Sequence, residues 1–231
     1  MIKLILVRHG QSTWNHENRF TGWTDVPLTD KGVEEAISAG KLLKSHGYSF
    51  DMAFTSLLKR SEDTLKYILK ELNEEDIIIK RSYKLNERHY GALQGLNKED
   101  TKKKYGSNQV LLWRRSVNER PPLLDVNDDR NPAKDIKYKD IDKNKLPLGE
   151  NLSDTIKRVC EYYNSDILPE LEQKKRILIV AHGNSLRGLI SYLDNMNEED
   201  VINLEIETGS PICYELDDNL KPIRHYYVKD E

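Results

Sequence analysis

The chain has 231 residues, of which 36 are Lys or Arg and 39 are Asp or Glu, so its formal net charge is -3. This length suffices for one large domain with a substantial core, and the near-neutral charge gives no global sign of a nucleic-acid or membrane partner. Two cysteines, Cys160 and Cys213, are too few for a disulfide framework or a thiolate metal site, so we expect both to be buried small hydrophobic residues.

The first predicted element is a strand that begins at Ile2 and runs through the apolar residues 4–7. An apolar run of this length, followed by Arg8-His9-Gly10, is typical of a buried parallel strand. A strand that begins at Ile2 leaves no room for a cleavable signal sequence. The apolar runs of the chain are also shorter than the roughly 20 residues needed to span a bilayer. We therefore expect a cytoplasmic location.

Strands and helices then alternate. A helix is predicted to begin with Thr29 or Asp30 as its N-cap and to end at Gly47. Residues 51–55 predict a second strand, residues 58–72 a helix with one apolar side, and residues 77–79 a third strand. This alternation is typical of βαβ units, so we expect an α/β fold with three layers, α/β/α, around a central and mostly parallel sheet.

The second half of the chain contains an irregular segment and then returns to the same alternation. Residues 98–118 have helical propensity, whereas residues 119–149 are rich in Pro, Asp, Asn and Lys and show little periodicity. A helix over residues 153–172, a strand at 177–181, a helix over 185–193 and strands near 211–216 and 223–228 follow. We expect one domain, 1–231, in which residues 119–149 form a surface excursion over the functional site.

One phrase occurs twice, at the ends of two predicted strands. Residues 4–12 read LILVRHGQS, and residues 177–185 read ILIVAHGNS. Ligands of open α/β sheets bind outside the carboxyl ends of the strands, so two adjacent strands would bring His9 and His182 into one site. Two unrelated histidines that bond to local backbone groups are the alternative.

The residues around His9 favour phosphoryl chemistry. A neutral imidazole is a nucleophile near pH 7, and the planar fork of Arg8 suits phosphate oxygens. Gly10 would let a bulky group approach the backbone. A zinc site made of His9, His89 and His182 is the alternative, but the neighbouring arginines would oppose a metal cation.

Longer motifs carry a resemblance to a known family. The chain resembles the 2,3-bisphosphoglycerate-dependent phosphoglycerate mutases of the histidine phosphatase superfamily. The motifs that carry this resemblance are Arg8-His9-Gly10, Trp14-Asn15, residues 20–23 (FTGW), residues 85–98 (LNERHYGALQGLNK), residues 113–115 (WRR), residues 181–187 (AHGNSLR) and residues 192–196 (YLDNM). The likeness spans nearly the whole chain, which makes it far more specific than the Arg-His-Gly motif alone.

The resemblance implies a role for each matching residue. His9 would be the phosphorylated nucleophile, Glu87 the general acid and base, and His182 a donor to the transferring phosphoryl group. Arg8 and Arg60 would hold the phosphoryl oxygens with Asn15 and the backbone amide of Asn184, which is predicted at a helix start. The rest of the substrate pocket would comprise Gly10, Gln11, Ser12, Thr13, Trp14, Thr21, Gly22, Arg88, His89, Tyr90, Lys98, Arg114, Arg115 and Gly183. By residue type alone, Trp14, Trp23 and Trp113 are packing residues, and Arg114 and Arg115 are solvated helix surface.

The implied reaction is the interconversion of 3-phosphoglycerate and 2-phosphoglycerate, an isomerase step of glycolysis and gluconeogenesis. It would need 2,3-bisphosphoglycerate as a primer and no metal. The substrates would be small phosphoglycerates, and the resemblance also suggests a homodimer or homotetramer.

Two departures from the family pattern bear on the activity. Gln11 stands where the family usually has Glu, and the printed chain stops at residue 231, where family mutases often continue into a lysine-containing tail. We therefore expect more hydrolysis relative to transfer than in tailed relatives. A bisphosphoglycerate phosphatase or synthase is the alternative activity, although Ser12 and Gly22 favour the mutase. A non-catalytic phosphate-binding protein is a third hypothesis, and the presence of His9, Glu87 and His182 together argues against it.

Overall fold

The computed structural model of the chain describes residues 1–230. Within these residues a six-stranded sheet has the order β3-β2-β4-β1-β5-β6. β3, β2, β4 and β1 are parallel, whereas β5 at one side pairs antiparallel with β1, and the edge strand β6 pairs antiparallel with β5. The mostly parallel central sheet is thereby confirmed. The strands are β1 (Ile2–Arg8), β2 (Met52–Thr55), β3 (Ile78–Arg81), β4 (Ile177–Ala181), β5 (Ile212–Leu216) and β6 (Pro222–Tyr227).

The two strands that carry the repeated phrase are direct neighbours. β1 pairs with β4 in parallel, from Leu4 opposite Ile177 to Arg8 opposite Ala181. The backbone N–H of His9 then donates to the carbonyl oxygen of Ala181 at 3.0 Å. Because the register matches the two phrases residue by residue, both histidines leave the sheet at the same edge. The predicted adjacency of these strands is confirmed.

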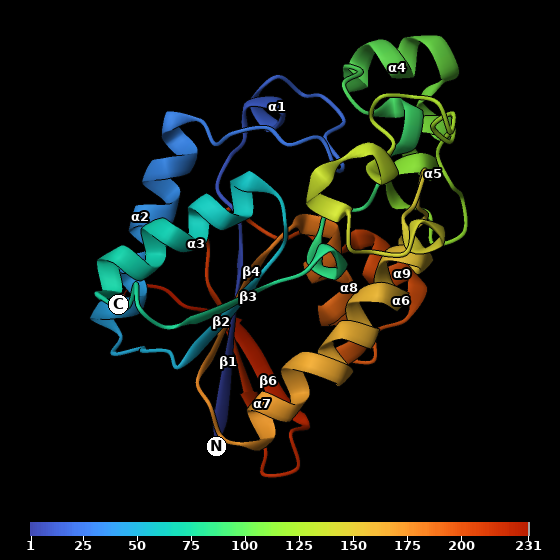
Figure 1. Ribbon diagram of the computed structural model, residues 1–231. Helices are drawn as coiled ribbons and strands as arrows, with labels where there is room; N and C mark the ends of the chain where they lie inside the picture. The colour runs from blue at the N-terminus through green and yellow to red at the C-terminus, as the bar shows by residue number, and fades with distance from the viewer. Residues whose placement is uncertain (231) are drawn as a thin grey trace.

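Helices cover both faces of the sheet, as Figure 1 shows. Side chains alternate along a strand, so Ile5 and Val7 face one layer while Leu4 and Leu6 face the other. The first layer contains α2 (Asp30–Ser45) and α3 (Lys59–Leu72), and the second contains α6 (Leu152–Tyr162), α7 (Leu168–Glu172) and α8 (Gly183–Leu193). The α/β/α expectation is therefore confirmed. The remaining helices are α1 (Thr13–His16), α4 (Lys98–Tyr105), α5 (Ser107–Arg115) and α9 (Glu198–Asn203).

Local chemistry explains where several elements begin and end. Thr29 caps α2, as expected, because its side chain accepts from the N–H of Gly32. The expected helix over 98–118 is two helices, because Gly106 adopts a φ of +88° between α4 and α5. The expected helix over 153–172 contains a π-helical turn, Tyr163–Ile167, between α6 and α7. The strand expected at residues 77–79 is displaced toward the C-terminus. Cys213 is buried, whereas Cys160 is only partly buried, so that expectation was half wrong.

Residues 119–149 form an irregular segment with three short 3-10 turns, Pro132–Lys134, Ile136–Tyr138 and Lys143–Lys145. Two further 3-10 turns, Tyr83–Leu85 and Gly91–Leu93, precede α4. The irregular segment packs behind the second of these turns, where Ala92 N–H donates to Pro122 O at 2.8 Å. Figure 1 shows the segment beside α4 and α5. Within residues 1–230 the basic pocket at the carboxyl ends of β1 and β4 has no lining residue from this segment, so its expected place over the site stays a prediction.

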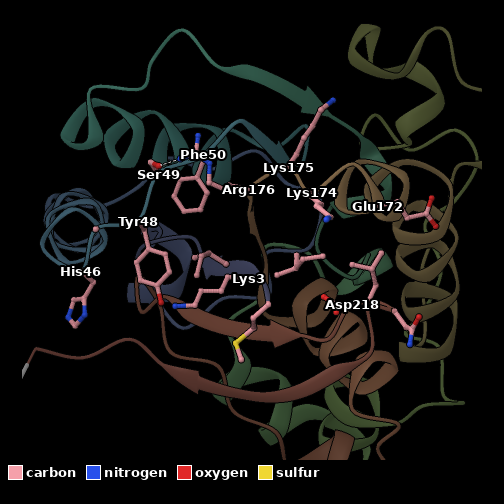
Figure 2. Close-up of a pocket in the computed structure, with 16 residues that line it drawn as sticks. Lys3, His46, Tyr48, Ser49, Phe50, Glu172, Lys174, Lys175, Arg176 and Asp218 are labelled. Atoms are coloured by element: carbon pink, nitrogen blue, oxygen red, sulfur yellow. Dashed lines mark hydrogen bonds between the residues drawn. The ribbon is translucent and has the colours of Figure 1, made fainter.

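A wide cavity lies around the amino-terminal end of β1, at the end of the sheet opposite His9 and His182. Its volume is about 920 Å³, and Lys3, Tyr48 and Arg176 are among the residues that surround it (Figure 2). Arg176 is paired there with Asp51 at 2.7 Å. In residues 1–230, no helix combines the length and the apolar character that a membrane crossing requires.

Candidate active site

A basic pocket lies at the carboxyl ends of β1 and β4. Its volume is about 150 Å³. The lining contains seven Arg or Lys side chains against two carboxylates, which suits a ligand with several negative charges. The lining residues within 1–230 are Arg8, His9, Asn15, Arg19, Thr21, Gly22, Arg60, Glu87, Tyr90, Lys98, Arg114, Arg115, Gly183, Asn184, Arg187 and Glu205.

His9 is held in one tautomer by the backbone of Gly10. Its Nδ1 lies 2.6 Å from the carbonyl oxygen of Gly10, which can only accept, so Nδ1 carries the proton and Nε2 carries the lone pair. Burial lowers the pKa of His9 well below its usual value, and the charges of Arg60 and Arg8 lower it further. A neutral imidazole with a free Nε2 is a nucleophile in the form that phosphoryl transfer requires.

His182 faces His9 across the ends of the two strands. The two rings meet edge to face with centroids 4.9 Å apart. Nε2 of His182 is 2.7 Å from Oγ of Ser56, while the buried Nδ1 has no hydrogen-bond partner in residues 1–230. Burial first, and then the charges of Arg60, His9, Arg158 and Arg8, lower the pKa of His182 well below its usual value. His182 is therefore neutral.

Arg8 and Arg60 place two guanidinium groups beside this pair. Arg8 donates from Nη1 to the carbonyl oxygen of Ile206 at 2.8 Å, and its buried Nε has no partner among the residues that the structure describes. Arg60 is 1% exposed and donates to the carbonyl oxygens of Thr24 and Gly22. Burial lowers the pKa of Arg60 to about 10, so it remains a cation at neutral pH. The backbone fixes the direction of both cations before a ligand arrives.

Glu87 stands opposite the histidines. Its Oε1 accepts from the backbone N–H of Arg88 at 2.7 Å and from that of Asn184 at 3.1 Å. Asn184 belongs to the first turn of α8, so the carboxylate occupies part of the anion site that a helix start provides. The carbonyl oxygen of Glu87 also accepts from Nε1 of Trp23 at 2.6 Å. Backbone N–H groups thus position the carboxylate of Glu87, and the side chain of Trp23 holds its carbonyl oxygen.

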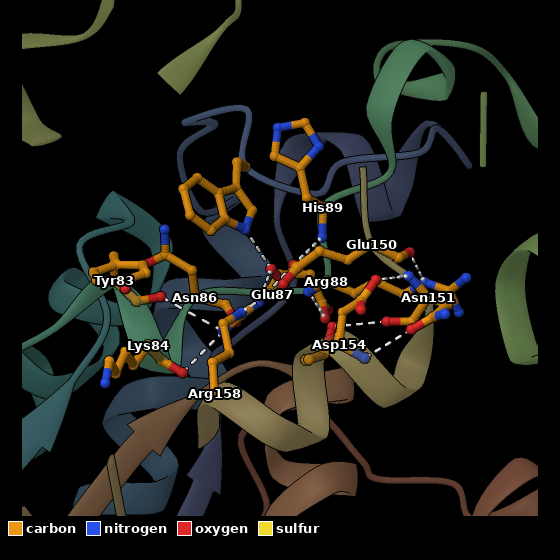
Figure 3. A network of polar contacts seen from close by, with 12 residues as sticks. Tyr83, Lys84, Asn86, Glu87, Arg88, His89, Glu150, Asn151, Asp154 and Arg158 are labelled. Atoms are coloured by element: carbon orange, nitrogen blue, oxygen red, sulfur yellow. Dashed lines mark hydrogen bonds and ion pairs between the residues drawn. The ribbon is translucent and has the colours of Figure 1, made fainter. Parts of the chain in front are cut away.

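A buried ion pair supports the backbone around Glu87 (Figure 3). Arg158, on α6, contacts both carboxylate oxygens of Glu150 at 2.8 and 2.9 Å. The same guanidinium donates to the carbonyl oxygens of Lys84, Asn86 and Glu87. The Arg158 and Glu150 side chains are only 9% and 5% exposed. Arg158 therefore connects α6 to the segment that carries the candidate acid and base.

The outer part of the pocket contains further cations. Burial lowers the pKa of Lys98 to about 8, and the neighbouring Arg114 and Arg8 contribute to this shift. Arg115 pairs with Glu205 at 2.6 Å. Arg187 donates to the side chain of Asn184 and to the carbonyl oxygen of Leu204. A carboxylate or second phosphate on a ligand would meet these groups at the pocket mouth.

Most of the predicted site residues lie in this pocket. The structure brings together His9, Glu87, Arg8, Arg60, Asn15, Thr21, Gly22, Tyr90, Lys98, Arg114, Arg115, Gly183 and Asn184 as lining residues, with His182 directly behind His9. Trp23 and Trp113 are buried in small apolar clusters, so their expectation as packing residues is confirmed.

The short segment after His9 differs from its expectation. A side chain at Gly10 would place Cβ 2.2 Å from the carbonyl oxygen of Gly32, so Gly10 is required for backbone packing and not for ligand approach. Gln11 accepts from the hydroxyl of Thr29 at 3.0 Å, and Ser12 caps α1. Within residues 1–230, Gly10, Gln11, Ser12, Thr13 and Trp14 are not lining residues of the pocket.

Arg88 and His89 also point away from the pocket. Arg88 is fully buried and donates to the carbonyl oxygens of Glu150 and Glu119. His89 accepts from the N–H of Gly91 at 2.9 Å, and its ring lies 5.3 Å from that of Trp23. Burial lowers the pKa of His89 to about 3, so it is neutral. Both side chains have structural contacts, while Nη1 of Arg88 and Nε2 of His89 have no partner within residues 1–230, and the substrate contacts of these two residues stay a prediction.

Three lining residues were not predicted, namely Arg19, Arg187 and Glu205. Arg187 lies one helical turn after Asn184 on α8, so its position next to a helix-start anion site was the available signal. Arg19 and Glu205 lie in irregular segments that only the tertiary fold brings to the pocket.

Comparison with known proteins agrees with this site. The model of the histidine phosphatase superfamily (branch 1) matches residues 4–127 and 125–229. Curated 2,3-bisphosphoglycerate-dependent phosphoglycerate mutases of Borreliella burgdorferi and Borreliella afzelii are 57% and 59% identical over 231 residues, which cover 100% of this chain and 93% of each relative.

Solved structures show the same fold at lower identity. The α-ribazole phosphatase of Shigella flexneri is 23% identical with a TM-score of 0.73, covering 96% of this chain and 95% of that one. A mycobacterial glucosyl-3-phosphoglycerate phosphatase is 21% identical with a TM-score of 0.70, covering 98% of this chain and 97% of that one.

The fold and the paired histidines define a member of the histidine phosphatase superfamily, branch 1. Within that superfamily, the identity along the whole chain places the protein in the family of 2,3-bisphosphoglycerate-dependent phosphoglycerate mutases.

Proposed function

We propose that the protein interconverts 3-phosphoglycerate and 2-phosphoglycerate, an isomerase reaction of glycolysis and gluconeogenesis, through a phosphohistidine on His9. The observation that carries the proposal is the identity of 57–59% to curated mutases over all 231 residues. The paired histidines, the opposing Glu87 and the surrounding cations supply the groups that this reaction needs.

The pocket has donors suited to a phosphoryl group. Nε of Arg8 and Nδ1 of His182 are buried and have no partner within residues 1–230. Unpaired buried donors are costly, and ligand oxygens that accept from them would remove this cost. Lys98, Arg114 and Arg115 would bind the remaining carboxylate or phosphate of a phosphoglycerate. These groups also fit 2,3-bisphosphoglycerate, which carries two phosphates and a carboxylate.

In the first half of the reaction, Nε2 of phosphorylated His9 gives its phosphoryl group to the free hydroxyl of a monophosphoglycerate. The P–N bond breaks as the new P–O bond forms, and the hydroxyl proton passes to the carboxylate of Glu87. Arg8, Arg60 and His182 stabilise the charge on the phosphoryl oxygens during transfer. In the second half, Nε2 of His9 attacks the other phosphate, and Glu87 returns the proton to the departing hydroxyl oxygen.

The dependence on 2,3-bisphosphoglycerate follows from this cycle, because unphosphorylated His9 cannot start it. The curated relatives carry the dependence on 2,3-bisphosphoglycerate in their name. We propose no metal in the reaction, since the arginines and histidines carry the positive charge. A homodimer or homotetramer and a cytoplasmic location remain part of the proposal.

A steady-state assay tests the proposal. Purified protein is given 3-phosphoglycerate with and without a trace of 2,3-bisphosphoglycerate, and formation of 2-phosphoglycerate is followed by ³¹P NMR. We expect conversion that depends on the primer and that His9→Gln abolishes. Release of inorganic phosphate without 2-phosphoglycerate would instead support the phosphatase alternative.

A further inference from the structure

A chain of buried hydroxyls lies behind His182. Oγ of Ser56 is 2.7 Å from Nε2 of His182 and also contacts Oγ of Ser61. The hydroxyl of Thr55 lies 3.1 Å from the same Ser61 oxygen. Thr55, Ser56 and Ser61 are all 0% exposed, so this chain is closed to solvent.

These hydroxyls come from two elements that meet at the end of the sheet. Thr55 ends β2, Ser56 follows it, and Ser61 lies in the first turn of α3. The backbone N–H of Leu58 donates to Oγ of Ser56 at 3.1 Å, which helps to fix this oxygen. Oγ of Ser56 is therefore held in place beside Nε2 of His182.

The contact with Ser56 decides which nitrogen of His182 is available to a ligand. Because Nε2 is occupied, Nδ1 is the ring nitrogen left without a partner among the described residues. A phosphoryl group offers only acceptors, so Nδ1 must carry a proton in order to bind it. A neutral imidazole has a single N–H, and Nε2 must then accept a hydrogen bond. Ser56 is the neighbour whose hydroxyl can donate it.

We infer that Ser56 is a positioning residue that sets the tautomer of His182, with its hydroxyl donating to Nε2 and Nδ1–H directed to the transferring phosphoryl group. Ser61 can donate to Oγ of Ser56 or to the carbonyl oxygen of Leu58, whereas the Thr55 hydroxyl donates to the carbonyl oxygen of Val180 at 2.7 Å. The inference rests on the proposed function for the identity of the phosphoryl acceptor, but the tautomer itself is independent of any substrate.

Long-range ¹H–¹⁵N NMR of the full chain with ¹⁵N-labelled histidine tests the tautomer directly. His182→Gln assigns the signals. We expect a protonated Nδ1 and an unprotonated Nε2 in the wild-type protein without ligand. A dominant Nε2–H form, or a doubly protonated ring, would overturn the inference, whether or not the protein proves to be a mutase.

Two serine variants separate the tautomer from general packing. Ser56→Ala removes the donor to Nε2, and Ser61→Ala removes an equally buried hydroxyl that does not touch the ring. We expect Ser56→Ala to lose the single tautomer and to lower kcat about 10- to 100-fold with little change in KM. Ser61→Ala should keep the tautomer and most of the rate.

The spectra and rates of Ser56→Ala and Ser61→Ala can each contradict the inference. An unchanged spectrum and rate in Ser56→Ala, with a folded protein by thermal unfolding, would contradict the inference. Equal spectral losses in both variants would contradict it too, because the direct contact would then have no special effect. Absence of mutase activity in the wild-type protein would refute the proposed function while leaving the spectral result to stand alone.

Discussion

Replacing Arg158 by Met should both destabilise the fold and slow the reaction. The substitution leaves the Glu150 carboxylate buried without its cation, since the two side chains are 5% and 9% exposed. Breaking a buried ion pair from one side costs about 3–5 kcal/mol, a large part of the 5–15 kcal/mol typical of a domain. The variant also removes donors from the carbonyl oxygens of Asn86 and Glu87. We therefore expect kcat to fall further than the stability loss alone explains.

Urea unfolding and steady-state kinetics measure the two effects of Arg158→Met. The matched control is Arg120→Ala, which breaks the exposed pair between Arg120 and Asp154. An exposed pair contributes only about 0–1 kcal/mol, so the control should unfold at nearly the wild-type urea concentration. The double variant Arg158→Met with Glu150→Met removes both charges and should recover part of the lost stability. A loss in Arg158→Met no larger than in Arg120→Ala would refute the reasoning.

Three further predictions concern the site itself. Gly10→Ala should destabilise the protein by about 1–3 kcal/mol in chemical unfolding, because the new Cβ would lie 2.2 Å from the Gly32 carbonyl oxygen. An unchanged unfolding midpoint would contradict this packing role of Gly10. Burial lowers the pKa of Lys98 to about 8, so its charge is present below that pH and lost above it. KM for 3-phosphoglycerate should therefore rise above pH 8, and Lys98→Arg should shift this rise to higher pH. An identical pH profile of KM in both proteins would exclude Lys98 as the origin of the rise. Glu87→Gln should lower kcat by about 10²–10⁴-fold without unfolding the protein, and near wild-type turnover would remove Glu87 from the proton transfer.

The core of the site could be predicted from the sequence because it follows from strand geometry. The two His-Gly phrases stand at the ends of apolar runs, and parallel pairing in register brings those ends together. The start of α8 at Gly183 likewise places the amide of Asn184 where an anion site was expected. These are local patterns joined by a single long-range pairing.

The sequence did not indicate the placement of residues whose contacts lie far along the chain. Arg88 and His89 follow Glu87 directly, but their side chains turn toward Glu150 and Gly91 instead of the pocket. The need for glycine at position 10 comes from Gly32, whose backbone is in contact only after α2 has docked. Residue type and spacing carry no information about such contacts.

The measurement closest to the central claim is the search for a phosphoryl group on His9. The full chain is incubated briefly with 2,3-bisphosphoglycerate, digested at alkaline pH and analysed by mass spectrometry beside His9→Gln. We expect an acid-labile phosphoryl adduct on His9 that is lost when 3-phosphoglycerate is added. Mutase activity without such an adduct, or an adduct on another residue that persists in His9→Gln, would contradict this claim.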